Sequence, residues 1–242
     1  NGIGSSKKLP LGIYTVKEVQ APANYGLNPT VFTADIEFAG QVVKLNVTDP
    51  VITAGVSIKK TGYAQTMNNN VMRWTVSGVR NDSTTSLQSF YWRDTLPTDA
   101  VRLTRLVTGT YSTTQTYKVT FTTNLNSQWR TAYDNLSTAK NYTLDMSSAA
   151  LGLASNEYVT QFMLSFGIVP AGFHQLTNAT VDAQTLYALT NGYKFTNKAD
   201  VGGLLGGNWV QSIARWTTSV YSHYVPAKPA APKSPTLPRT GY

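Results

Sequence analysis

Hydrophobic and polar residues alternate in short runs along most of the chain, and turn-forming residues separate these runs. A period of two is typical of strands that bury one face, whereas a helical face repeats every three to four residues. In the first fifty residues the runs are Ile13–Val19, Val31–Phe38 and Val42–Val47. Farther along they are Gly55–Lys60, Met72–Val79, Ser89–Arg93, Val101–Thr108, Thr116–Thr123, Phe162–Phe166, Tyr193–Asn197 and Trp209–Tyr221. The pattern therefore predicts an all-β protein.

One stretch departs from this alternation. Within Ser127–Leu136, the residues Trp129, Tyr133 and Leu136 follow the i, i+4, i+7 spacing of one helical face. We therefore expect a short helix inserted among the strands. The longer stretch Ser127–Ser155 matches no pattern to which we assign a role.

The spacing of the runs suggests three parts. Residues 1–50 resemble a piece of a small β-sandwich, and residues 51–225 carry enough strands for a second, larger one. Residues 226–242 begin with a proline-rich stretch, PAKPAAPKSPT, which favours the extended polyproline II conformation of a stiff spacer. We expect the chain to be a fragment of a longer protein at both ends.

Composition narrows the function classes. The chain of 242 residues is 41% hydrophobic and 13% charged, and it contains no cysteine, so neither a disulfide nor a thiolate nucleophile is available. The net charge of +8 is spread along the chain without a basic stripe, which argues against nucleic-acid binding. His174 and His223 have no neighbours at metal-ligand spacing, and we expect no metal, no cofactor and no enzymatic site that acts on a separate substrate.

The tail carries the most specific motif. The proline-rich spacer runs into Leu237, Pro238, Arg239, Thr240 and Gly241, which resemble the LPxTG sorting signal of Gram-positive surface proteins. The resemblance implies that a sortase cleaves after Thr240 and joins the protein to cell-wall peptidoglycan, and that a C-terminal membrane span is removed in this step. It therefore implies an extracellular, wall-attached protein.

A second motif is YTVKEVQAPANY, Tyr14–Tyr25. It resembles the E-box of collagen-adhesin B-type stalk domains, with Val19 and Asn24 departing from the usual pattern. The resemblance implies that Glu18 catalyses an isopeptide bond, for which Asp49 is a candidate acceptor. Period-two geometry puts Val43, Leu45, Val47 and Asp49 on one face, although Asp49, which precedes Pro50, is alternatively a plain turn residue. Lys7 and Lys8 lie in a loop, so we expect the donor lysine upstream of residue 1.

Three further runs end in a polar residue that shares the face of its apolar neighbours. Lys60 follows Val56 and Ile58, Asp94 follows Phe90 and Trp92, and Asn197 follows Tyr193 and Phe195. The neighbouring Lys59 is out of phase, so we expect it to be solvated. Asp94 is alternatively a turn residue before Thr95-Leu96-Pro97, and Asn197 an ordinary asparagine at the end of a strand.

The runs that hold these three residues resemble the first, central and last strands of collagen-adhesin A-type domains. The resemblance implies Ig-like sandwiches in tandem and an autocatalytic isopeptide bond between Lys60 and Asn197, with Asp94 as the catalytic acid. We therefore expect a structural stalk of a wall-anchored adhesin or pilin-like protein, with any host ligand bound by an unseen N-terminal region. The alternatives are a ligand- or glycan-binding module, for which the aromatic run Trp209–Tyr224 offers platforms, and the spacer of a surface-anchored enzyme.

Overall fold

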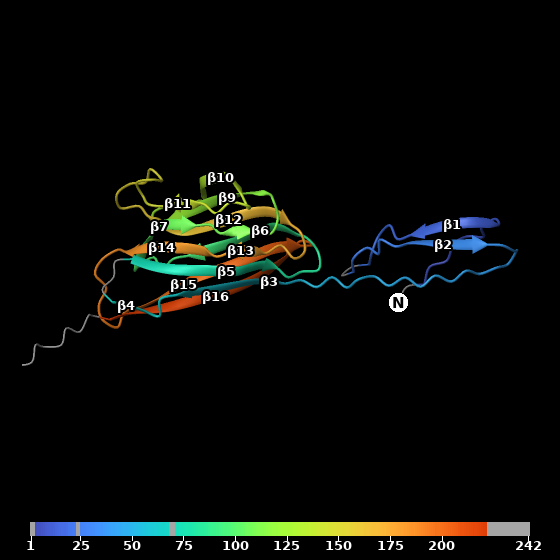
Figure 1. The fold of residues 1–242 in the computed structure, drawn as a ribbon, viewed down its shortest axis with the longest axis horizontal. Helices are drawn as coiled ribbons and strands as arrows, with labels where there is room; N and C mark the ends of the chain where they lie inside the picture. The colour runs from blue at the N-terminus through green and yellow to red at the C-terminus, as the bar shows by residue number, and fades with distance from the viewer. Residues whose placement is uncertain (1–2, 23–24, 68–70, 222–242) are drawn as a thin grey trace, which may run out of the picture.

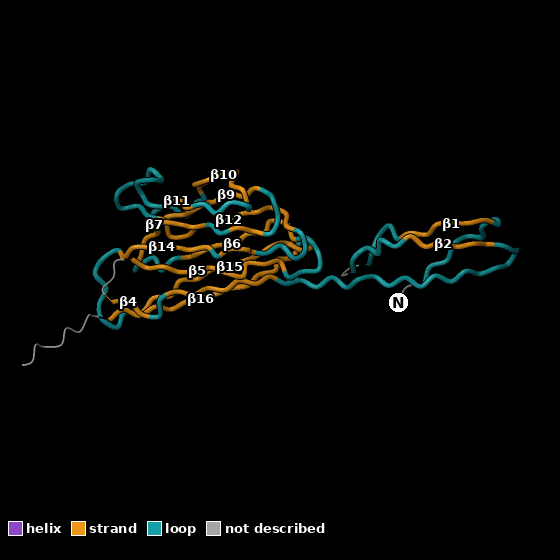
Figure 2. Tube along the Cα trace, viewed as in Figure 1, coloured by secondary structure: helices purple, strands orange, loops and turns teal. Residues whose placement is uncertain are grey.

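The computed structural model describes residues 3–22, 25–67 and 71–221, and within these ranges it contains strands and loops but no helix. It consists of a two-stranded ribbon near the N-terminus and a large β-sandwich, joined by an extended segment (Figures 1 and 2). In the ribbon, β1 (Gly12–Lys17) pairs antiparallel with β2 (Val31–Ile36). The predicted all-β, Ig-like fold is confirmed.

Two sheets form the sandwich, and a short β-ribbon made of β13 (Gln175–Thr177) and β8 (Thr110–Tyr111) accompanies them. In spatial order the larger sheet contains β10 (Arg130–Ser137), β9 (Thr116–Thr123), β12 (Val159–Val169), β6 (Leu87–Thr95), β15 (Lys194–Leu205), β16 (Asn208–Tyr221) and β4 (Gln65–Met67). The smaller sheet contains β11 (Thr143–Asp145), β7 (Val101–Val107), β14 (Ala179–Thr185), β5 (Val71–Asn81) and β3 (Val56–Gly62). All the pairings are antiparallel except that of β4 with β16.

The core lies between the two sheets and is built from the inward rows that the alternation predicts. Trp74, Phe90 and Trp92 are each no more than 1% exposed. The Trp92 indole packs edge-to-face on Phe162, with the ring centroids 5.5 Å apart, and donates its N–H to the Tyr111 hydroxyl at 2.8 Å. Because a buried indole N–H needs an acceptor, this bond lets a large aromatic side chain fill the centre of the core.

The predicted helix in Ser127–Leu136 is wrong, because this stretch forms the edge strand β10. β10 pairs with β9, and its register shifts between Tyr133 and Leu136, which lie opposite Val119 and Tyr117. Three residues on β10 thus span the distance of two on β9, as in a β-bulge. The extra residue places Tyr133 and Leu136 against the core at a spacing of three, which imitates the period of a helix.

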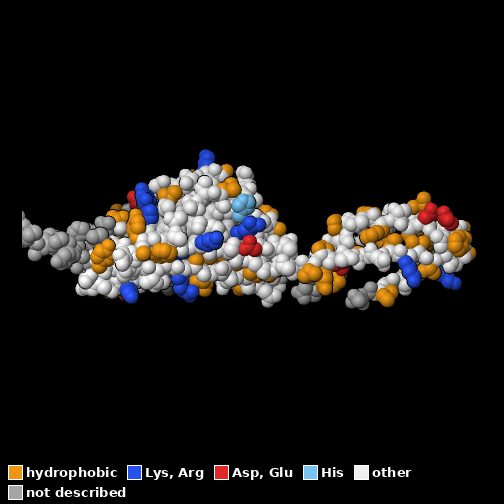
Figure 3. Space-filling view, turned by 60° about the horizontal axis from the view of Figure 1, so that its bottom comes forward, with side chains coloured by type: hydrophobic (Ala, Val, Ile, Leu, Met, Phe, Trp, Pro, Cys, Tyr) orange, Lys and Arg blue, Asp and Glu red, His pale blue; other side chains and the backbone are white. Residues whose placement is uncertain are grey.

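The predicted strand Val42–Val47 is also not formed. The inward face expected for Val43, Leu45, Val47 and Asp49 does not exist, since Val43 and Val47 are 38% and 46% exposed. Among the described residues, no second sheet packs against the ribbon of β1 and β2, and hydrophobic side chains lie on the surface of this part of the molecule (Figure 3). A two-stranded ribbon alone offers too little buried surface to order a third strand.

An ion-pair cluster stabilises the smaller sheet. Asp182 on β14 lies opposite Arg73 on β5 and Arg105 on β7, and its carboxylate accepts hydrogen bonds from both guanidinium groups, with Arg73 Nε at 2.6 Å and Arg105 Nε at 2.8 Å. Burial alone would raise the pKa of Asp182, but the bonds from the two arginines outweigh it, and the net shift of the pKa is downward.

We expect Asp182→Asn to lower the free energy of unfolding at pH 7 by about 1–2 kcal/mol. This loss lies between the losses typical of exposed and of buried ion pairs, because Asp182 is buried while the two arginine side chains are half exposed. The melting temperature should fall by roughly 3–6 °C. Since a carboxylate with a lowered pKa stabilises above its unfolded value of about 4, the difference from wild type should shrink as the pH falls below that value. Asp82→Asn, in the exposed pair with Arg80, is the control and should change little. A difference that persists unchanged at pH 2 would contradict this account.

Candidate functional site

Lys60 lies on β3 with its side chain turned into the core. The alternation of β3 exposes Lys59 and buries Lys60, whose amine is shielded completely from solvent. The Lys60 Nζ lies 5.8 Å from the centre of the Trp74 ring, and Trp74 in turn packs edge-to-face on Phe195. The lysine therefore sits in a largely apolar surrounding.

Asp94 and Asn197 come from neighbouring strands of the other sheet. Asp94 on β6 lies opposite Ala199 on β15, two positions along the same inward face from Asn197. Both residues are 0% exposed. The Lys60 amine donates a hydrogen bond to Asp94 Oδ2. Because β3 belongs to the smaller sheet and packs on β15 and β16, the cluster of Lys60, Asp94 and Asn197 bridges the two layers of the sandwich.

The surroundings shift both ionisable groups toward their neutral forms. Burial lowers the pKa of the Lys60 amine, although the nearby Asp94 carboxylate acts in the opposite direction. Burial likewise raises the pKa of Asp94, although Lys60 and Asn197 oppose the shift. Desolvation penalises the charged form of each group, so an uncharged amine beside an uncharged carboxylic acid becomes accessible.

The cluster also contains buried polar atoms without partners. Asp94 Oδ1 and both polar side-chain atoms of Asn197 are inaccessible to solvent and make no hydrogen bond in the described part of the chain. Asn197 is nevertheless close enough to Asp94 to influence its pKa. Buried side-chain polar atoms are nearly always paired, so an asparagine with two unpaired atoms beside a buried lysine calls for a specific explanation.

One sequence expectation about this cluster needs correction. The resemblance to A-type domains implies that the run with Asn197 is the last strand, but β15 is followed by β16, which folds back on it and places Trp216 opposite Asn197. Asn197 therefore lies on the penultimate strand. The Trp216 indole donates to the Tyr63 carbonyl at 2.9 Å, which fixes the chain that leaves β3 against β16.

In the N-terminal part, Glu18 and the segment before Asp49 meet at Asn28, which the sequence pattern did not indicate. The Asn28 backbone N–H donates to Glu18 Oε2 at 2.7 Å, and the Asn28 side chain donates to the Thr48 carbonyl at 2.8 Å. Glu18 and Asp49 are half-buried, and Asp49 Oδ1 is a buried atom without a partner among the described residues. Lys7 and Lys8 are exposed.

The sorting motif Leu237–Gly241 and the spacer before it lie outside the described residues. Within the described ranges there is no group of three or more potential metal-ligating residues. No helix in these ranges has the length and apolar character needed to cross a membrane.

Residues 1–51 match the family model of the SpaA prealbumin-like fold domain. No curated protein matches the chain. The major pilin subunit of Bacillus cereus is similar with a TM-score of 0.38 and 10% identity, over 88% of this chain and 56% of the pilin. The collagen-binding domain of a Staphylococcus aureus adhesin is similar with a TM-score of 0.31 and 13% identity, over 69% of this chain and 99% of that domain. AggA, the major subunit of aggregative adherence fimbriae type I of Escherichia coli, is similar with a TM-score of 0.29 and 10% identity, over 70% of this chain and 95% of AggA. The chain thus spans about half the length of the pilin.

Proposed function

We propose that this chain is a stalk region of an extracellular surface protein, and that a spontaneous isopeptide bond between Lys60 and Asn197 locks its sandwich. The observation that carries the proposal is the buried cluster that bridges the two sheets. A lysine amine, a carboxyl and an asparagine amide meet there in a solvent-free core, and three of their polar atoms lack partners among the described residues. Amide formation between two of these groups accounts for an arrangement that would otherwise be costly.

The reaction needs no cofactor and no water. The neutral Lys60 amine attacks the Asn197 side-chain carbon while protonated Asp94 donates a hydrogen bond to the amide oxygen. The new bond joins Lys60 Nζ to Asn197 Cγ, and the bond from Cγ to Nδ2 breaks. Asp94 takes a proton from the attacking nitrogen and passes one to the leaving nitrogen, which departs as ammonia. The shifts of both pKa values toward neutrality support each role.

The link would stabilise the sandwich by restricting the unfolded chain. It closes the long loop from residue 60 to residue 197, for which the loop-entropy relation for cross-links gives about 5 kcal/mol. A protein outside the cell without cysteine has no disulfide to serve this purpose. The proposed bond takes over that function in a cysteine-free chain.

The N-terminal part would hold a related site. Glu18 is the proposed catalytic carboxyl and Asp49 the proposed acceptor. Asp49 Oδ1, which has no partner in the part of the chain that the structure describes, supports this reading. Lys7 and Lys8 are exposed and are not the proposed donors.

The protein would be attached to a Gram-positive cell wall through Thr240. Peptidoglycan and a sortase are its proposed partners, and the proline-rich stretch before Leu237 would hold the motif in an extended, accessible form.

Incubation with a housekeeping sortase and a glycine nucleophile is expected to give a product in which Thr240 carries the nucleophile. Mass spectrometry of the C-terminal peptide checks this result. Thr240→Ala is the matched control and should abolish the product. Absence of the product with sortases of several classes would refute the anchoring proposal and leave the Lys60–Asn197 proposal untouched.

A further inference from the structure

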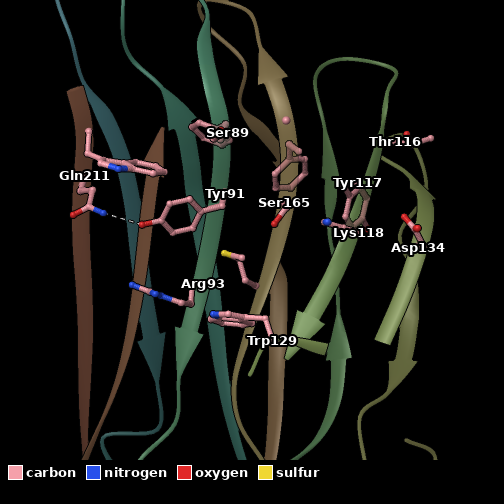
Figure 4. A pocket seen from close by; sticks show the side chains of 15 residues that line it. Ser89, Tyr91, Arg93, Thr116, Tyr117, Lys118, Trp129, Asp134, Ser165 and Gln211 are labelled. Carbon is pink, nitrogen blue, oxygen red and sulfur yellow. Dashed lines mark hydrogen bonds between the residues drawn. The ribbon is translucent and has the colours of Figure 1, made fainter. Parts of the chain in front are cut away.

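An open groove of about 730 Å³ crosses the outer face of the larger sheet, on the opposite side of β6 from the Lys60 cluster. It is lined by outward-facing residues of several strands, among them Tyr91 and Arg93 on β6, Lys118 on β9 and Ser165 on β12. Figure 4 shows Tyr91 and Gln211 on one side, Lys118 and Asp134 on the other, and Ser165 between them. Its volume falls within the range of small-molecule sites.

Exposed tryptophans flank the groove. Trp129, just before β10, is 40% exposed, and Trp209 on β16 is 54% exposed. The Trp209 ring packs edge-to-face on Tyr91 with the centroids 5.9 Å apart, so its position is fixed although its face is open. Exposing two large aromatic side chains around one hollow is costly in water and is typical of a surface that stacks a ligand.

The polar groups of the groove are preorganised. Arg93 holds Asp200, which is 3% exposed, through two hydrogen bonds of 3.1 Å and 3.0 Å. The Gln211 amide donates to the Tyr91 hydroxyl at 3.0 Å and leaves its carbonyl oxygen available as an acceptor. A ligand would therefore meet donors and acceptors that are already oriented.

The charges in and below the groove balance. Arg93 is paired with Asp200, and Lys118 and Asp134 both line the groove. Because these four charges cancel and the lining offers both donors and acceptors, the groove favours an uncharged, hydroxyl-rich ligand over an acidic or basic one.

The backbone around the groove is irregular. In the described ranges, the non-glycine residues with positive φ are Ser89 at 50° and Asn135 at 54°. Ser89 lines the groove, and Asn135 directly follows Asp134, which also lines it. A register shift in β12 at Gly167, whose φ is 74°, lies opposite Phe90. Bulges re-aim side chains and are frequent beside binding sites.

We propose that this groove binds a neutral oligosaccharide. The apolar faces of its pyranose rings would stack on Trp129 and Trp209, and its hydroxyl groups would exchange hydrogen bonds with Gln211, Asp134 and Arg93. Addition of a peptide strand is disfavoured here, because β6 and β12 pair with a neighbouring strand on both sides and offer no free backbone edge. The proposal is independent of the isopeptide bond.

The test is a screen of the full chain on an array of neutral oligosaccharides built from hexoses and N-acetylhexosamines, followed by tryptophan-fluorescence titration with the strongest binder. Trp129→Ala and Trp209→Ala are each expected to weaken binding at least tenfold, and Gln211→Ala severalfold. Tyr63→Ala is the matched control, since Tyr63 is 54% exposed and lies outside the groove, and it should bind like the wild type.

Thermal unfolding of each variant shows whether the fold is kept, and both tryptophans are exposed enough for their loss to be tolerated. The proposal is overturned if no neutral oligosaccharide binds at millimolar concentration, or if binding survives both tryptophan substitutions. It is also overturned if a proline-rich or collagen-like peptide binds through the same two tryptophans while the oligosaccharides do not.

Discussion

Asp94→Ala is expected to leave Lys60 and Asn197 unlinked, so that its intact mass equals the sequence mass after allowance for the substitution. The wild-type chain should be lighter than its sequence mass by one ammonia. Without the carboxyl, no group can shuttle the proton from the attacking amine to the leaving nitrogen. The variant should lose about 5 kcal/mol of loop-closure stabilisation, a large share of a total of about 5–15 kcal/mol. Its melting temperature should fall by roughly 10–20 °C.

Removing Asp94 also leaves the buried Lys60 amine without its partner carboxylate, and this loss destabilises the sandwich by itself. The double variant Lys60→Met/Asp94→Ala removes that charge, and its remaining deficit in melting temperature isolates the effect of the link. Lys59→Ala, one position away and exposed, should keep both the mass deficit and the wild-type stability. A wild-type chain of full sequence mass, or a mass deficit that survives in Asp94→Ala, would show that the assignment of the three residues is wrong.

Trp74→Ala is expected to yield a population of chains in which the link is incomplete. Trp74 lies beside the Lys60 amine, and its removal opens a cavity that admits water to the amine. A hydrated lysine recovers its ordinary high pKa and is protonated, so it attacks slowly. Intact mass, followed over time after purification, measures the linked fraction. The substitution should also cost about 3–5 kcal/mol through the cavity itself.

Phe173→Ala is the matched control for this effect. Phe173 is as buried as Trp74, and its ring stacks on Tyr111. Its carbonyl accepts a hydrogen bond from the Asn81 backbone N–H, and Asn81 lies opposite Val56, at the start of β3, and not opposite Lys60. It should lose similar stability and still form the link completely. Trp74→Phe, which keeps an apolar ring, should restore most of the linked fraction. Complete linkage in Trp74→Ala would contradict the role assigned to Trp74.

Strand parity predicts that Lys60, Asp94 and Asn197 each point into the core, and the resemblance to collagen-adhesin A-type domains implies that they meet there. Each residue continues an apolar row by a step of two, and a row that faces a common core brings its polar members to that core as well. The burial of Lys60 and the exposure of Lys59 follow from the same rule. Which strands become neighbours does not follow from parity, and this is why Asn197 was placed on the last strand when it lies on the penultimate one.

Other features could not be predicted, since they depend on local irregularity or on side chains brought together by the fold. The bulge between Tyr133 and Leu136 changes the spacing from two to three, and a sequence pattern cannot distinguish that from a helical turn. The groove combines outward-facing residues of separate strands with Trp129, which comes from the misassigned stretch. Tyr91 and Trp209 are more than a hundred positions apart and meet only because β15 lies between β6 and β16. Outward positions show no periodicity that marks a ligand site.

The position of Lys60 near the start of the sandwich has a mechanical consequence. A pull along the chain would reach the sandwich at β3, which begins at Val56, and leave it at the end of β16, Tyr221. With a bond between Lys60 and Asn197, the tension would pass directly from β3 to β15, and the residues between the two linked positions would carry no load. The strands β6, β9 and β12 under the groove belong to that unloaded loop. Under such a pull the sandwich would bear tension through covalent bonds, while the strands on the floor of its groove keep their arrangement.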